Sequence, residues 1–163
     1  MASENRTTKK QPKRPAKLSQ HQSYIFRIDS PGTSYSLAID HGRLAGGPYR
    51  EHHDLAIDGT LVFPEKLNGR QGKLIFLGDR RTTRELAHPE ESRLDPLCVG
   101  TLTIWGQTTN YLGSLPHDAI WPVLAAIASG HFRMIALSGE SLFRGSAKIQ
   151  SVYFERCVNP EDW

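Results

Sequence analysis

The chain has 163 residues, a length that suits one domain with a hydrophobic core of its own. Hydrophobic residues make up 38% and charged residues 23%, as in a globular protein that carries some unstructured chain. No apolar run approaches the roughly 18 residues of a membrane span, and two cysteines are too few for a disulfide scaffold. We therefore expect neither a transmembrane helix nor a disulfide-rich domain, and no motif resembles a known family.

The positive charge is concentrated in residues 1–20. The chain has a formal net charge of +3, but these residues hold six basic side chains and one acidic one, whereas the remainder holds 14 basic and 16 acidic side chains. Two prolines and almost no apolar residue predict a disordered tail, which either solubilises the chain or contacts nucleic-acid phosphate. The candidates for that contact are Lys9, Lys10, Lys13, Arg14 and Lys17.

No apolar segment follows the basic stretch as it would in a secretory signal. We expect a cytoplasmic protein, or a nuclear one if the cell is eukaryotic, with no membrane partner. The predicted organisation is a basic tail over 1–20, one β-rich domain over 21–158 and a short polar tail over 159–163.

The first half of the domain shows strand patterns separated by turn residues. Residues 24–28 and 35–40 read as a hairpin joined by Pro31-Gly32, and residues 42–53 read as a glycine-rich loop. Residues 54–63 resume the β pattern, in which Asp58-Gly59 is either a tight turn or a bulge in one longer strand. Pro64 ends this segment.

The next predicted elements are a turn, a strand and a long loop. Asn68-Gly69 and Gly72 mark the turn, and residues 74–77 form a compact buried strand that ends at Gly78. Residues 79–96 form a mainly polar stretch that contains four arginines and five acidic residues. A loop of this length in a compact domain is usually functional or mobile.

The second half contains the only predicted helix. Residues 97–105 read as a central strand, with residues 109–112 as its partner or continuation. Apolar residues then recur at helical spacing over 118–129, with Pro116 and Asp118 as start signals and Gly130 as the stop. Strands follow at 132–137 and 147–154. Neither face of the last strand is wholly polar, which indicates cover on both sides or an interface.

These elements predict a mainly β fold: a β-sandwich or partly open barrel of seven or eight strands, with the helix at one end or over one sheet. An α+β roll is the alternative. Predicted core residues are Leu102, Ile104, Leu124 and Ile135, and the aromatic residues Trp105, Tyr111 and Trp121 are expected in the core as well.

One segment concentrates side chains that could perform chemistry: Glu51, His52, His53 and Asp54. Adjacent residues of a strand point to opposite faces, so His52 and His53 cannot easily share a metal ion. We predict no metal site and no cofactor. Cys98 is expected as an inert buried thiol and Cys157 as an exposed one, and the two can pair only if their strands lie side by side.

Three classes of function remain open. The preferred one is a non-catalytic interaction module that binds a protein partner or assembles with itself through loops 42–53 and 79–96. Its candidate binding residues are Tyr49, Arg50, His52, Arg80, Arg81 and Arg84. The alternatives are a nucleic-acid-associated protein anchored by its tail, and a small enzyme that uses Glu51, His52, His53 or Asp54.

Overall fold

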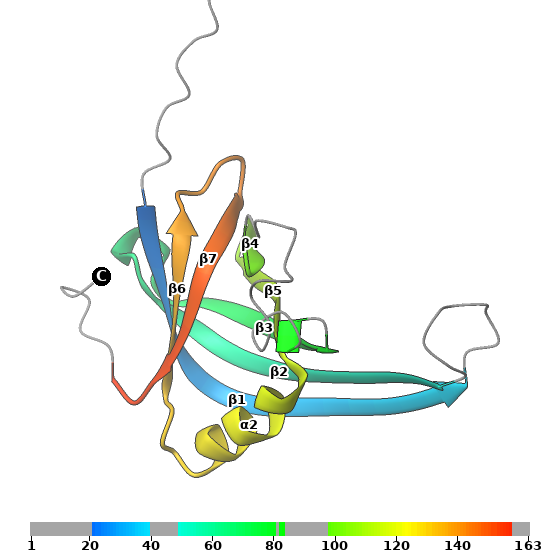
Figure 1. Cartoon of the computed structure of the whole chain (residues 1–163). Helices are drawn as coiled ribbons and strands as arrows, with labels where there is room; N and C mark the ends of the chain where they lie inside the picture. The colour runs from blue at the N-terminus through cyan, green and yellow to red at the C-terminus, as the bar shows by residue number, and fades with distance from the viewer. Residues whose placement is uncertain (1–20, 40–48, 81, 84–97, 158–163) are drawn as a thin grey trace, which may run out of the picture.

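A computed structural model describes residues 21–39, 49–80, 82–83 and 98–157. Within these residues, seven strands form a closed barrel in the order β1-β2-β3-β5-β4-β7-β6 (Figure 1). The strands are β1 (His21–Ile39), β2 (Tyr49–Phe63), β3 (Arg70–Asp79), β4 (Gly100–Trp105), β5 (Thr108–Pro116), β6 (Met134–Glu140) and β7 (Ser146–Glu155). The 3-10 helix η1 (Glu65–Leu67) follows β2, whereas η3 (His117–Ala119) leads directly into the α-helix α2 (Ile120–Ala128).

The barrel closes because β6 pairs with β1 on one side and with β7 on the other. Neighbouring strands are antiparallel except for β3 and β5, which are parallel. The mainly β fold with one helix near 118–129 is confirmed, with a closed barrel as its form. Alternate residues of each strand point into the barrel, where Leu55, Phe76 and Leu102 are fully buried.

Helix α2 begins and ends where its sequence predicts. Pro122 is its third residue, a position at which no backbone N–H is needed, and Gly130 follows its end with φ 73°. The helix buries Ile120 and Ile127 against the barrel core. Because these side chains join the same cluster as the inward residues of the strands, α2 completes the core instead of forming a separate layer.

The predicted hairpin at residues 24–40 is wrong, because β1 runs through it as one strand. Ile28 pairs with Gly59 and Ser30 with Asp58, so Asp29 is the extra residue of a β-bulge. The bulge changes which residues lie on the face of β1 that lines the core, from Phe26 and Ile28 before it to Thr33 and Tyr35 after it, although these last two are exposed. In the sequence, this reversal of the apolar alternation makes one bulged strand look like two strands joined by a turn.

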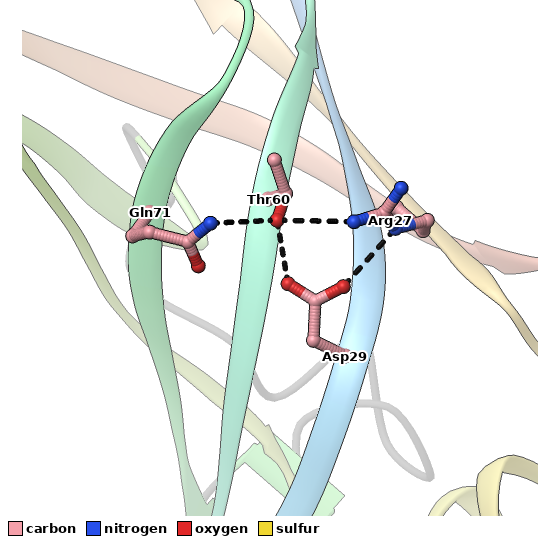
Figure 2. A network of polar contacts seen from close by, with 4 residues as sticks. All are labelled: Arg27, Asp29, Thr60 and Gln71. Atoms are coloured by element: carbon pink, nitrogen blue, oxygen red, sulfur yellow. Dashed lines mark hydrogen bonds and ion pairs between the residues drawn. The ribbon is translucent and has the colours of Figure 1, made fainter.

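Polar contacts hold this bulge in place, as Figure 2 shows. The Thr60 hydroxyl of β2 donates to Asp29 at 2.6 Å and accepts from Gln71 of β3 at 3.1 Å. Arg27 donates to Asp29 at 3.0 Å and to Thr60 at 3.4 Å. Asp29 therefore binds across strands where the sequence suggested a turn-forming role. Pro31 is tolerated because β1 lies at an edge of the sheet there.

A second bulge explains the mixed faces of β7. Ser138 pairs with Ser151 and Gly139 with Ile149, which leaves Gln150 as the extra residue. Ala147 and Ile149 are buried before the bulge, and the opposite set, Val152 and Phe154, packs against the core after it. The two halves of β7 bury opposite faces of the strand, and for this reason neither face is wholly polar.

Several smaller expectations are settled by the structure. Asn68-Gly69 forms the predicted turn, but Gly72 lies within β3, and Asp58-Gly59 lies inside the single strand β2. The two cysteines are free, with Cys157 exposed and Cys98 only partly buried. Among the predicted core residues, Leu102 and Ile135 are fully buried, whereas Ile104 and Leu124 are partly buried.

The aromatic residues divide between core and surface. Tyr111 is buried, but Trp105 and Trp121 are 83% and 53% exposed, so their assignment to the core was wrong. Burial raises the pKa of Tyr24 to about 12, and burial followed by the nearby Cys98 raises that of Tyr111. Both phenols therefore stay neutral to a higher pH than an exposed tyrosine does. The Tyr24 hydroxyl donates to the Glu140 carbonyl at 3.1 Å.

Candidate interaction surface

β1 and β2 continue beyond the barrel as a two-stranded ribbon. β6 pairs with β1 only as far as Arg27, and β3 pairs with β2 only up to Asp54. The pairing of β1 with β2 nevertheless runs on to Ile39 and Tyr49. In Figure 1 this ribbon extends away from the barrel. We call residues 35–39 and 49–53, which pair with no third strand in the described structure, the arm.

The predicted loop 42–53 therefore contains strand at its end. Tyr49 and Arg50 lie in β2, near the outer end of the arm, and residues 40–48 lie outside the described residues. The bulge that the sequence did not reveal places Tyr35 opposite His53, and directly paired residues share a face of a sheet. His52 is exposed, which confirms that the two histidines point to opposite faces.

The inner face of the arm is apolar at its base and exposed farther out. Tyr35 is 54% exposed and Leu37 is 60% exposed, and they share one face because they are two residues apart on a strand. Leu37 pairs with Glu51 of β2. The same face carries Leu55 inside the barrel. The face that lines the core thus continues outward onto a surface, where Tyr35 and Leu37 pair with His53 and Glu51.

His53 joins the arm to helix α2 through a cluster of four rings. Its ring lies 5.7 Å from that of Tyr35, 5.1 Å from that of His117 and 4.9 Å from that of Trp121, measured between ring centroids. His53 is only 3% exposed. Contact with Trp121 holds the base of the arm against helix α2. A two-stranded ribbon needs such support because it is barely stable alone.

Neither ring nitrogen of His53 has a hydrogen-bond partner in the described part of the chain. A buried polar group without a partner costs about 1–3 kcal/mol. We expect His53→Phe, which keeps a planar ring and removes both nitrogens, to raise the free energy of unfolding by about 1 kcal/mol in urea denaturation. His52→Phe, the exposed neighbour, is the control and should stay within about 0.5 kcal/mol. A loss of more than 1 kcal/mol at position 53 would show that its ring nitrogens are needed.

A cavity of about 280 Å³ lies where the arm leaves the barrel. It is lined by His52, His53, Asp54, Leu77, Gly78, Asp79 and Ser114. Three of the four residues considered for catalysis thus border the cavity, although the side chains of His52 and His53 lie on opposite faces of β2. However, the Asp54 carboxylate accepts a hydrogen bond from the Ser34 hydroxyl, and its carbonyl accepts one from Thr33 at 2.7 Å. These contacts give Asp54 a role in joining β1 to β2.

No group of three metal-binding side chains occurs among the residues with described positions. Nor does any helix in the described ranges have the length and apolar character needed to span a bilayer.

The second predicted loop is described only at its start. Arg80 is exposed and lies in a short helical turn with Thr82 and Thr83. The Thr83 hydroxyl accepts a hydrogen bond from the His117 backbone N–H at 2.9 Å, which connects this turn to η3. Arg81, Arg84 and the five basic tail residues lie outside the described residues.

Tyr35, Leu37 and Trp121 were missed as surface residues. The sequence does contain one signal: the segment from Ser30 to Ile39 holds no charged residue, which is unusual for an exposed strand. Comparison of the chain with known protein families, curated proteins and solved structures finds no significant match.

Proposed function

We propose that this protein is a non-catalytic interaction module that binds a protein partner, a second copy of itself included, through the arm. The observation that supports this most directly is the ribbon beyond the barrel with Tyr35 and Leu37 exposed on one face. Tyrosine is enriched among residues that contribute strongly to protein interfaces. An apolar surface on a projecting element is typical of a binding site.

The arm also suits this role energetically. Its strands have no third neighbour in the described structure, and a two-stranded ribbon is marginally stable in water. A partner that covers Tyr35 and Leu37 would remove apolar surface from water, at about 25 cal/mol for each Å² buried. The aromatic cluster at the base holds the arm in position before binding, which lowers the entropic cost of association.

The test is a double substitution, Tyr35→Ser with Leu37→Ser. The wild-type chain and the variant are used to capture proteins from an extract of the source cells, and purified samples are compared by sedimentation. We expect the variant to bind its partner at least tenfold more weakly, because both apolar contacts are lost. The melting temperature is measured alongside and should stay within a few degrees, because both side chains are exposed and the contact of His53 with Trp121 remains when the Tyr35 ring is lost.

A matched control is available on the barrel wall. Leu112 is 54% exposed on β5 and Tyr153 is 43% exposed on β7, so Leu112→Ser with Tyr153→Ser removes the same residue types from another surface. Binding that is equal in both double variants and the wild type would contradict the proposal. If the substitutions in the arm leave binding unchanged but removal of residues 1–20 abolishes it, the interaction belongs to the tail.

A further inference from the structure

One edge of β1 pairs with no strand of the described structure from Ser30 to Ile39, at the base of the arm and along it. Beyond Arg27, β1 has β2 as its only strand neighbour in the described residues, and residues 30–39 pair with β2 alone. At about 3.3 Å per residue, this edge is roughly 33 Å long. An open edge of this length is a site at which another strand can add by main-chain hydrogen bonding.

The open edge carries no charge, and this favours a strand identical to itself. Natural edge strands are usually protected by lysines, prolines or bulges, but Ser30 to Ile39 contains only Pro31, at one end. The other strand of the arm differs, because Arg50, Glu51 and Asp54 of β2 are charged. Two copies of β1 can therefore lie side by side without repulsion between like charges, which destabilises directly opposed residues.

The point at which residues 1–20 join the fold is compatible with such pairing. They join β1 at His21, and β1 runs 19 residues from there to Ile39 in the arm, roughly 60 Å when extended. Antiparallel pairing about a two-fold axis in the arm places the two attachment points at opposite ends of the assembly. The repulsion between two tails of six basic residues is then weak, because this separation is several times the Debye length of about 8 Å at physiological salt.

We propose that two copies of this chain pair their β1 edges over residues 30–39 in antiparallel orientation. The inference rests on the proposed function, for which it names the partner. Pairing of this kind is isologous, so each copy uses the same surface and the assembly closes as a dimer. It brings Tyr35 and Leu37 of both copies onto one continuous face, where each covers part of the exposed apolar surface of the other.

The first test measures the mass of the purified full chain by light scattering and sedimentation from 1 to 200 μM. We expect a concentration-dependent dimer. Ser36→Lys places a charge on an exposed position of the proposed edge, close to the same charge from the second copy, and should raise the dimer dissociation constant at least tenfold. Thr103→Lys, at an exposed position of β4, is the matched control and should leave the constant unchanged.

The second test locates the two-fold axis by disulfide cross-linking. Single cysteines are placed at Thr33, Ser34 and Ser36 in a chain whose Cys98 and Cys157 are changed to Ser, with Thr103→Cys as control. We expect oxidised dimer at the positions nearest the axis and none at the control. This pattern requires β1 edges that face each other in antiparallel register.

The outcomes separate the two proposals. A chain that remains monomeric at 200 μM, or a dimer indifferent to Ser36→Lys, overturns the pairing of edges. If the double substitution Tyr35→Ser with Leu37→Ser still abolishes the capture of another protein in that case, the arm binds a different partner and the proposed function stands. If neither dimer nor captured protein responds to any change in the arm, both proposals fail.

Discussion

Phe76→Ala is expected to lower the free energy of unfolding by about 3–5 kcal/mol, the range measured when a large aromatic side chain is removed from a packed core. Phe76 is fully buried at the centre of β3. Its ring lies 5.1 Å from that of Tyr111 and 5.3 Å from that of Phe154, so it connects two other strands across the barrel interior. The change removes contacts with both rings and leaves a cavity.

Urea denaturation measures this loss, and the next residue supplies the control. Leu77 is 45% exposed on the outer face of the same strand, so Leu77→Ala should cost less than about 1 kcal/mol. Because side chains alternate along a strand, a shift of β3 by one residue would exchange the two positions. A greater loss at Leu77 than at Phe76 would show that the register of β3 is wrong.

Gly139→Ala should destabilise the barrel by about 3 kcal/mol, at the upper end of what overpacking usually costs. Gly139 lies beside the bulge at Gln150. A Cβ atom there would overlap the Lys148 carbonyl oxygen and approach the Ile149 Cα to 2.8 Å. These are backbone atoms, which cannot rotate away, so the strands themselves must move apart at the junction of β6 and β7.

Gly32→Ala is the matched control for this substitution. It is also a glycine in a strand, but its added Cβ would meet only the Ala56 carbonyl oxygen, at 3.7 Å, which is an ordinary contact. Its effect should stay within about 0.5 kcal/mol. If Gly139→Ala were tolerated equally well, β7 would not bulge at this place, and the exchange of its buried face would need another explanation.

The sequence alone determined the class of fold and most of its elements. Alternation of apolar residues predicted strands at 54–63 and 97–105, and apolar residues at helical spacing predicted α2, with Pro116 and Gly130 at its limits. These patterns are local, because each reports only which side of an element is buried. The opposite orientation of His52 and His53 followed from the same alternation and is confirmed.

The bulges could not be predicted in this way. An extra residue at Asp29 or Gln150 reverses the alternation, and in the sequence that reversal cannot be distinguished from a turn or from a strand covered on both faces. Which of these forms is decided by neighbouring strands. Thr60 on β2 supplies the partner for Asp29, and Gly139 on β6 gives β7 the space for its extra residue.

The candidate site depended still more on tertiary structure. Loop 42–53 was predicted to contact a partner, and its last residues, 49–53, lie in β2. Tyr35 and Leu37, however, were assigned to an ordinary hairpin, and Trp121 to the core. Their exposure follows from where β3 and β6 stop pairing with β2 and β1, which is a relation between distant segments. Local sequence determined that these residues lie in a strand and a helix. That β1 and β2 extend past the barrel was decided only by how the barrel closes. No local pattern indicates where a neighbouring strand ends.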